Sequence, residues 1–296
     1  MKRRTAIILF VLIVLILVCG AVFVYSYYSF INGDDFNPEV DGNKTISIAN
    51  WNLQIFGDSK ANNTELMNLY AEKISKYDII FLQEIRDKDG SSFVSLCSML
   101  PDYDCIVSSR AGRSSSKEQY GIVYLKKFDI NLVDYNPDSA DRWERPPVRV
   151  DFQYNNYSFI VYNIHTKPDD VSSELHNLDS LVGSSSDSGT AEQNIIVLGD
   201  LNADCNYYNP YSSTDFVDWN WVIGNDADTT SGNSDCAYDR IILNQDAYNE
   251  FIVTGIDFSG IDSKVSDHYL VWALLRDYDY QKDKTFKAYL NSMFNK

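Results

Sequence analysis

A carboxylate and an amide lie two residues apart at the end of an apolar stretch. The stretch Ile195 to Asn202 has the sequence Ile-Ile-Val-Leu-Gly-Asp-Leu-Asn, which predicts a buried strand that runs into a glycine and a catalytic loop. If the strand continues that far, Asp200 and Asn202 point the same way, because alternate side chains of a strand share a face. Metal and phosphate chemistry both use such a pair. The alternative is an ordinary turn, since Asp and Asn are common turn residues.

Similar polar residues stand at the ends of other apolar stretches. All of them are able to bind a metal ion or to move a proton, and they are Asn52, Glu84, His165, Asp200 with Asn202, Asp239, and Asp267 with His268. Each one alone has a simple explanation, because strand ends are polar and a single histidine is more often structural than catalytic. Together they include two of the 3 histidines in the chain, and they predict one site at one edge of a sheet.

Phosphodiester hydrolysis is the chemistry that would use this set of side chains. It needs an activated water, neutralisation of charge in the transition state, and a proton for the leaving oxygen. Carboxylate and amide oxygens suit Mg²⁺, Mn²⁺ or Ca²⁺, and a histidine serves as general acid or base near neutral pH. The chain has no Cys/His zinc spacing, no Gly-Lys-Ser/Thr loop and no Gly-x-Ser-x-Gly elbow. Zinc enzymes, nucleotide switches and serine hydrolases therefore receive little support.

Strands and helices that alternate along the chain must position these residues. Besides the stretch described above, apolar periodicity predicts strands at 45–51, 78–82, 103–108, 120–126, 131–135, 148–153, 159–164, 240–243 and 269–275. It predicts helices at 65–77, 92–100 and 172–181. This order of elements predicts a mixed α/β protein with more than one sheet face to cover.

The N-terminal residues differ from the rest of the chain. Three basic residues, Lys2 to Arg4, precede an apolar run from Ala6 to Tyr25, which is long enough to cross a bilayer. The run is longer than the apolar core of a signal peptide and lacks a small-residue cleavage site, so residues 1–30 favour a membrane anchor over a signal peptide. The positive-inside rule then leaves the N-terminus in the cytoplasm and the remainder of the chain outside the cell.

The chain after this segment predicts one exported domain. Residues 31–44 are polar and predict a tether, and residues 45–296 contain no linker-like stretch, which predicts a single catalytic domain. An outside location permits disulfides. The domain has four cysteines, which allow three pairings that spacing does not distinguish: Cys97, Cys105, Cys205 and Cys236.

The composition is strongly acidic, with a formal net charge of −17. This charge argues against a module that binds nucleic acid through a broad basic surface. It argues less against an enzyme that uses divalent cations, because the bound ions are then the largest charges in the site.

Several motifs resemble, in chain order, those of the endonuclease/exonuclease/phosphatase superfamily. They are Asn50-Trp51-Asn52, Leu82-Gln83-Glu84, Asn163-Ile164-His165, Gly199-Asp200-Leu201-Asn202 and Ser266-Asp267-His268. Within the superfamily the chain is similar to secreted deoxyribonuclease I. The most specific matches are Gln83 to Asp87, Gly199 to Cys205, and Asp228-Thr229-Thr230 followed by Cys236 to Ile241. The resemblance covers about Ile46 to Leu275. It implies a four-layered α/β sandwich, in which two mixed β-sheets pack face to face with helices on the outside.

The resemblance also implies which residues carry the reaction. His165 and His268 would form the acid–base pair, with Glu118 supporting His165 and Asp239 supporting His268. The metal ion and the scissile phosphate would be held by five residues: Asn52, Glu84, Asp200, Asn202 and Asp267. The implied cofactors are Mg²⁺ or Mn²⁺, together with Ca²⁺.

Further residues are implied outside this centre. Arg86 and Arg145 would contact the nucleic-acid backbone. A structural Ca²⁺ site would include Asp228 and Thr230. The larger disulfide of the family would join Cys205 to Cys236 and tie the loop after Asn202 to the segment that carries Asp239.

The chain departs from the family pattern at three places. Gln54 replaces a basic residue that follows the first-strand asparagine, and Ser116 replaces a minor-groove tyrosine, so the preference for double-stranded DNA is less secure than the reaction. The short loop from Asp134 to Arg142 lacks a small cysteine loop, which argues against a second calcium site there. Cys97 and Cys105 are then free to pair with each other.

The sequence therefore predicts an anchored or secreted, metal-dependent endonuclease that cleaves extracellular DNA with little sequence specificity. We expect a monomer, and no protein partner is inferred. One alternative is a phospholipid or sphingomyelin phosphodiesterase of the same superfamily, which the anchor would place beside its lipid. A non-catalytic binding protein with the same fold is disfavoured, because every expected acid, base and metal ligand is present.

Overall fold

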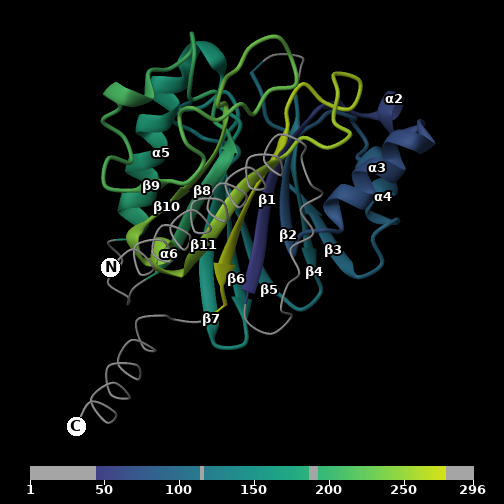
Figure 1. The fold of residues 1–296 in the computed structure, drawn as a ribbon, viewed down its shortest axis with the longest axis horizontal. Coiled ribbons are helices and arrows are strands. Elements are labelled where there is room, and N and C mark those ends of the chain that lie inside the picture. Colours follow the sequence, from purple (N-terminus) through teal and green to yellow (C-terminus); the bar gives the residue numbers. More distant parts are fainter. Residues whose placement is uncertain (1–44, 114–116, 187–192, 278–296) are drawn as a thin grey trace, which may run out of the picture. The chain divides into compact units, whose positions relative to one another are not determined.

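Two mixed β-sheets form the centre of the domain, and helices lie on their outer faces (Figure 1). The structure, a computed structural model, describes residues 45–113, 117–186 and 193–277. The expected anchor at residues 1–30 and the tether at 31–44 lie outside these ranges. Among the helices of the described ranges, none is long and apolar enough to cross a membrane.

Each sheet has six strands. The first has the order β11-β12-β1-β2-β4-β3, and its strands are β11 (Phe251–Asp257), β12 (Leu270–Arg276), β1 (Thr45–Phe56), β2 (Ile79–Ile85), β4 (Gln119–Leu125) and β3 (Tyr103–Val107). The second has the order β5-β6-β7-β8-β10-β9, and its strands are β5 (Asp129–Asp134), β6 (Val148–Tyr154), β7 (Tyr157–Asn163), β8 (Asn194–Asp200), β10 (Asp239–Leu243) and β9 (Asn220–Trp221).

The main hydrophobic core lies between the two sheets. It is built from alternate residues of the strands, such as Ile48 and Phe81 of the first sheet and Val161 and Leu198 of the second. Because side chains alternate between the two faces of a strand, the other residues face outward toward the helices. The central strands, such as β2, β8 and β10, are buried on both faces, because their outward residues pack against the helices and loops.

The helices cover the outer faces of the sheets. Helices α2 (Asp58–Ala61), α3 (Thr64–Ile74) and α4 (Ser91–Cys97) lie beside the first sheet, and α5 (Val171–Ser186) packs on the second through Leu175, Leu178 and Val182. The remaining helical segments are α6 (Gln245–Glu250) and the short 3-10 turns η1 (Pro168–Asp170) and η2 (Pro210–Ser212). The expected four-layered sandwich is confirmed.

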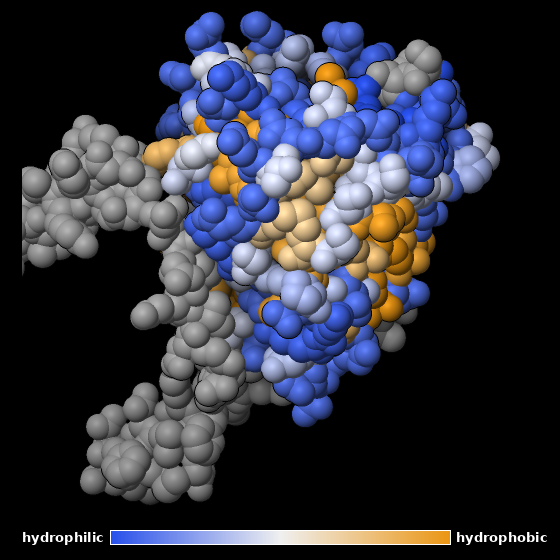
Figure 2. Space-filling view, turned by 90° about the vertical axis from the view of Figure 1, so that its right-hand side faces the viewer, coloured by the Kyte–Doolittle hydropathy of each residue, from blue (hydrophilic) through white to orange (hydrophobic). Residues whose placement is uncertain are grey.

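The side that carries α2, α3 and α4 is mostly hydrophilic, with hydrophobic residues gathered near its middle (Figure 2). Exposed large apolar residues of this part of the chain include Val94 and Met99 near α4 and Val107 at the end of β3. A disulfide between Cys97 and Cys105 joins α4 to β3.

Some elements differ from the sequence prediction. The strand predicted at 45–51 continues to Phe56, whereas the helices predicted at 65–77 and 92–100 end earlier, at Ile74 and Cys97. Helices α2 and α6 and strand β11 were not predicted. In β11, Gly255 faces the ring of Trp272 so closely that a Cβ would lie 2.5 Å from it, a tertiary contact that local periodicity does not reveal.

Strand direction brings the predicted polar ends to one edge of the molecule. Strands β1 and β2 are parallel, as are β7 and β8, so Asn52, Glu84, His165 and Asp200 follow strands that end together. Antiparallel β4, β10 and β12 start at the same edge and bring Glu118, Asp239 and His268 to it. The expectation that these residues gather at one edge is therefore correct.

Candidate active site

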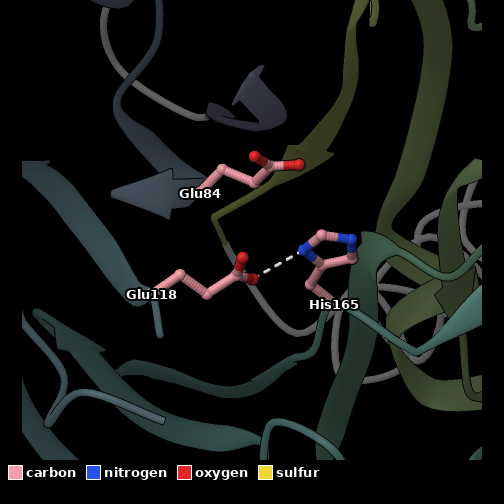
Figure 3. A group of neighbouring side chains, drawn as sticks. All are labelled: Glu84, Glu118 and His165. Atoms are coloured by element: carbon pink, nitrogen blue, oxygen red, sulfur yellow. Dashed lines mark hydrogen bonds and ion pairs between the residues drawn. The ribbon is translucent and has the colours of Figure 1, made fainter. Parts of the chain in front are cut away.

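His165 and Glu118 form one hydrogen-bonded pair, which we call the His165 pair. His165 follows β7 and Glu118 precedes β4, and the His165 Nδ1 lies 2.6 Å from the Glu118 Oε1 (Figure 3). Both residues are buried, and the backbone N–H of His165 donates to the hydroxyl of Tyr120 at 3.1 Å. The carboxylate therefore fixes the tautomer and orientation of the ring and leaves Nε2 facing the site.

Two arginines frame the His165 pair. The guanidinium of Arg145 lies 3.2 Å from Glu118 and donates to the backbone oxygens of His165 and Thr166 at 2.9 and 2.8 Å. Arg86 Nε lies 3.7 Å from the other oxygen of Glu118. Burial alone would raise the pKa of Glu118, but His165, Arg145 and Arg86 hold the pKa below its ordinary value. Glu118 is thus an ionised carboxylate shared by three cationic groups.

His268 and Asp239 form a second pair of the same kind, the His268 pair. Asp239 is the first residue of β10, and its Oδ2 lies 2.7 Å from the His268 Nδ1. The backbone oxygen of His268 accepts from Trp51 Nε1 at 2.9 Å, and its N–H donates to the hydroxyl of Ser266 at 3.1 Å. These contacts fix the ring at the start of β12.

The His268 pair is buried to a similar extent as the His165 pair but has fewer charged neighbours. Burial is the largest influence on Asp239 and raises its pKa to about 6, although His268 opposes the rise. Burial would lower the pKa of His268, but Asp239 and Asp200 overcome it and raise the pKa to about 10. The pKa of His165 is also raised, because Glu118 outweighs the opposing effect of burial.

The two pairs converge on one oxygen atom. The Nε2 of His165 lies 3.3 Å and the Nε2 of His268 lies 3.5 Å from the Oδ2 of Asp200. Asn52 Nδ2 donates to the same oxygen at 2.9 Å. Burial would raise the pKa of Asp200, but His268 and His165 keep it below its ordinary value. Two imidazoles that face one point from opposite sides can handle the proton of an attacking water and that of a leaving oxygen.

The geometry around Asp200 corrects one expectation. Strand β8 ends at Asp200, and Asn202 has a φ of 46°, so the two side chains are not placed by strand alternation. The Asp200 Oδ1 accepts from the backbone N–H of Asn202 at 3.2 Å, which is an Asx turn. Asn202 Nδ2 donates to the Thr166 oxygen at 3.0 Å, beside His165. The turn formed by Asp200 and Asn202 is therefore itself part of the site.

Gly199 is required where β8 meets the strand end that carries His165. Its φ is 146°, and a Cβ at this position would lie 1.9 Å from the backbone oxygen of Ile164. Only glycine allows the two backbones to approach this closely. In the Gly-Asp-Leu-Asn sequence, the glycine is thus required by backbone packing, whereas Asp200 and Asn202 contribute to the chemistry of the site.

Oxygen donors suited to a divalent cation lie beside the two pairs. Asn52 Nδ2 lies 3.4 Å from Glu84 Oε1, so its amide stands between Glu84 and Asp200. Glu84 also accepts from the backbone of Ile55 and from Arg86, and its φ of 62° marks a strained backbone of the kind found at functional sites. Asp267 is at the rim, with a side chain that is 51% exposed and an oxygen 3.9 Å from His268 Nε2.

This donor set fits a hard cation better than a soft one. In the described part of the chain, potential ligands form two clusters: Glu84, Glu118 and His165 in one, and Asp200, Asp239 and His268 in the other. Glu118 and Asp239 already hold the Nδ1 atoms of the histidines, and the carboxylates of Glu84 and Asp200, with the amide of Asn52 between them, lie together beside both pairs. Oxygen donors are preferred by Mg²⁺, Mn²⁺ and Ca²⁺.

Comparison with known families agrees with this geometry. The model of the endonuclease/exonuclease/phosphatase family matches residues 49–268, which include every residue of both pairs. The chain belongs to the endonuclease/exonuclease/phosphatase family.

Curated relatives within this family are nucleases by name. The chain is 31% identical to mouse deoxyribonuclease-1-like 2 over 69% of this chain and 78% of the relative. It is 30% identical to human deoxyribonuclease-1, over 69% of this chain and 79% of that protein, and 32% identical to human deoxyribonuclease gamma, over 67% and 72%.

Solved structures of the family share the fold at low sequence identity. A family protein from Bacteroides thetaiotaomicron superimposes with a TM-score of 0.58 at 16% identity, over 79% of this chain and 98% of that one. The catalytic domain of human nocturnin gives a TM-score of 0.56 at 17% identity, over 78% and 94%. These likenesses support the four-layered fold.

Other residues singled out by the family resemblance lie around the centre. The sulfurs of Cys205 and Cys236 form a disulfide, which ties the loop after Asn202 to the chain just before Asp239. Asp228 Oδ1 accepts from the backbone N–H and the hydroxyl of Thr230 at 3.0 and 2.9 Å. A calcium ion at Asp228 and Thr230 stays a prediction.

The two arginines differ in their surroundings. Arg86 borders Glu84 and is partly exposed, whereas the guanidinium of Arg145 is nearly buried against Glu118 and the backbone after His165. Contact of Arg86 and Arg145 with nucleic acid stays a prediction. Of the three departures from the family pattern, two concern single residues: Gln54 follows Asn52 with a φ of 47°, and Ser116 lies outside the described residues.

Sequence reasoning missed two residues that hold the site together. Lys60 Nζ donates to the backbone oxygens of Leu53 and Val265, both at 2.7 Å, and burial lowers its pKa to about 8. The hydroxyl of Thr229 accepts from the backbone N–H of Asp239 at 3.1 Å. Lys60 lies in a four-residue helix without a periodic signal, whereas Thr229 was available from the Asp228-Thr229-Thr230 motif.

Proposed function

We infer that this protein is a metal-dependent endonuclease that hydrolyses phosphodiester bonds of DNA outside the cell, with His165 and His268 as the acid–base pair. The observation that carries this inference is the convergence of both Nε2 atoms on the Oδ2 of Asp200. The names of the curated relatives supply the substrate class.

Different side chains of the site carry out proton transfer and orient the groups that perform it. Each histidine exchanges a proton through Nε2, while Glu118 or Asp239 holds its Nδ1. The proton of the attacking water and the proton for the leaving oxygen are thereby handled at two separate atoms. Asn52 orients the Asp200 carboxylate between them.

The oxygen donors near the pairs would hold the divalent cation. Glu84, Asn52 and Asp200 are the inner candidates, and Asn202 and Asp267 border them. When bound, Mg²⁺ or Mn²⁺ supplies charge neutralisation and polarisation of the phosphate. We propose that Ca²⁺ at Asp228 and Thr230 stabilises the loop that precedes Asp239.

A local cluster of basic residues supports a polyanionic substrate despite the acidic composition. Arg110 donates from its guanidinium to the backbone oxygens of Arg86 and Lys117, at 3.0 and 2.8 Å. Arg86 itself contacts Glu84 at the site. Positive charge therefore gathers beside the metal donors, where a phosphate backbone would lie.

The proposed location outside the cell rests on the N-terminal sequence. The chain enters the described domain at Thr45, which pairs with Arg276, and Asn52 lies at the other end of the same strand. We propose that residues 1–30 anchor the domain to the membrane or are removed to release it, so that the reaction takes place outside the cell.

Plasmid cleavage tests the proposal. The protein is incubated with supercoiled plasmid and Mg²⁺ plus Ca²⁺, and it should nick and linearise the DNA, whereas excess EDTA should abolish the reaction. His176→Ala is the matched control, because His176 is 70% exposed and contacts Asp215 rather than the site. Intact plasmid with the metals present would overturn the proposal, and cleavage that survives EDTA would overturn its metal requirement.

A lipid phosphodiesterase is the second candidate, and one observation favours it. The segment between β8 and β10 exposes Tyr211 by 76% and Val217 by 68%. Under the lipid hypothesis, these are the side chains that would contact a bilayer surface. Release of phosphocholine from sphingomyelin or phosphatidylcholine vesicles, without plasmid cleavage, would favour the lipid reaction over the nuclease.

A further inference from the structure

A layer of buried polar side chains lies between the hydrophobic core and the catalytic pairs. Asn50, Gln83 and Asn163 have no exposed surface. Each follows, two residues along its strand, an apolar residue of the core between the sheets: Ile48, Phe81 and Val161 respectively. Because alternate residues share a face, the three amides point into the space between the sheets.

Asn50 is the junction of this layer. Its Oδ1 accepts from Gln83 Nε2 at 2.6 Å and from Asn163 Nδ2 at 3.4 Å. Its Nδ2 donates to the Oδ1 of Asp239 at 3.3 Å. With two donors directed at its oxygen, the amide of Asn50 has one orientation that satisfies all three contacts, and in that orientation the amino group faces Asp239.

The contact crosses from the first sheet to the second and ends at the His268 pair. Asp239 uses Oδ1 for Asn50 and Oδ2 for His268. Asn52, two residues further along the same face of β1, donates in the same way to Asp200. Strand β1 therefore supplies one amide donor to each of two carboxylates that contact the histidines: Asn50 donates to Asp239, and Asn52 donates to Asp200.

We propose that Asn50 is a positioning residue that fixes the carboxylate of Asp239 and, through it, the imidazole of His268. Gln83 keeps the amide of Asn50 in the required orientation. Asn50 does not touch the substrate, and its effect passes through His268. The role rests on the proposed function, because it concerns the acid–base pair of that reaction.

The structure suggests a variant and a control on the same strand. Asn50→Leu keeps the approximate volume and removes both the donor to Asp239 and the acceptor for Gln83. Ser47→Ala is the control, since Ser47 is equally buried on β1 but donates to Asp78, at the opposite end of the strand. A displaced imidazole should lower kcat of Asn50→Leu by about 10- to 100-fold with KM within about twofold of wild type.

Combining Asn50→Leu with His268→Ala distinguishes a positioning role of Asn50 from a general structural role. In the His268→Ala background, Asn50→Leu should cause no further loss of kcat, and Ser47→Ala should leave kcat unchanged in either background. If Asn50→Leu slows the His268→Ala enzyme by the same factor as wild type, the proposal is overturned. Should Asn50→Leu fail to fold, Gln83→Met tests the same contact and should lower kcat by about 3- to 10-fold.

A spectroscopic measurement makes the test independent of the reaction. The proton on the His268 Nδ1, observed by NMR in the metal-free protein, should shift in Asn50→Leu and remain in place in Ser47→Ala. An unchanged proton signal in Asn50→Leu overturns the positioning role. A shifted signal in a protein that does not cleave plasmid would instead overturn the proposed function and leave the positioning of His268 intact.

Discussion

The His165 pair and the His268 pair contain the same groups in different electrostatic surroundings. Glu118 is shared by His165, Arg145 and Arg86. Among the described residues, Asp239 has one ionic partner, His268, and its other contacts are neutral donors such as Asn50. Consequently the pKa of Glu118 is lowered, whereas burial raises that of Asp239 to about 6.

Two guanidiniums and an imidazole stabilise the ionised form of Glu118, whereas among the described residues His268 is the one ionic partner that stabilises the ionised form of Asp239. A lowered pKa means that the folded protein stabilises the ionised form, and a raised pKa means that it destabilises that form. The guanidiniums of Arg145 and Arg86 stabilise the His165 pair in the folded protein. The His268 pair depends instead on hydrogen bonds and on close packing, which makes it the more sensitive of the two.

Removal of either imidazole should have the largest effect. His165→Ala and His268→Ala should each lower kcat for plasmid cleavage by about 10²- to 10⁴-fold, because each would remove a general acid or base. Initial rates at saturating Mg²⁺ measure the effect. A variant that keeps the wild-type rate would exclude its histidine from the reaction.

Replacement of the two carboxylates should separate activity from stability. Glu118→Gln should lower both kcat and Tm, because it removes the counter-charge of the nearly buried Arg145 and one of the carboxylates that Arg86 contacts. Asp239→Asn should lower kcat by about 10²-fold and should lower Tm by less than Glu118→Gln, because it removes the counter-charge of one imidazole, which can lose its proton, and not that of a guanidinium, which cannot. Parallel thermal melts and initial rates test the contrast, and equal losses of Tm in the two variants would contradict it.

Titration of the metal-free protein should show the smallest of these effects, which is a difference between the pKa values of Asp239 and Glu118. As the pH falls, Asp239 should take up a proton near pH 6, whereas Glu118 should remain ionised below its ordinary pKa of 4.5. Between about pH 4 and 6 the folded protein then binds more protons at Asp239 than the unfolded chain, so this group favours folding as the pH falls. Carboxyl ¹³C chemical shifts report both groups, and coincident titrations would refute the difference.

Much of the site could be predicted because each functional residue follows or precedes an apolar strand. The strands that carry Asn52, Glu84 and Asp200 toward their ends, and the strand that His165 follows, are apolar enough to be recognised, and strand direction then brings these residues to one edge. The family resemblance added Glu118, which precedes a strand but has no distinctive neighbours in sequence.

The parts that escaped prediction depend on contacts between distant segments. Asn50 and Asp239 are separated by 189 residues, so no local pattern connects them. Lys60 joins Leu53 to Val265 across the fold. The position of Asn202 was attributed to strand alternation, whereas a local hydrogen bond to Asp200 ends the strand and sets the turn. Propensity and periodicity describe neighbours in sequence, and these three features are set by tertiary structure or by side-chain capping.

The central claim is that the two pairs act as one unit on a group that lies between them. Its most direct test is the rate of plasmid cleavage by the double variant His165→Ala/His268→Ala, compared with the two single variants. Residues that act as a unit are strongly non-additive, so the double variant should be within several-fold of the slower single variant. If the two losses multiply instead, the histidines act independently and the account is wrong.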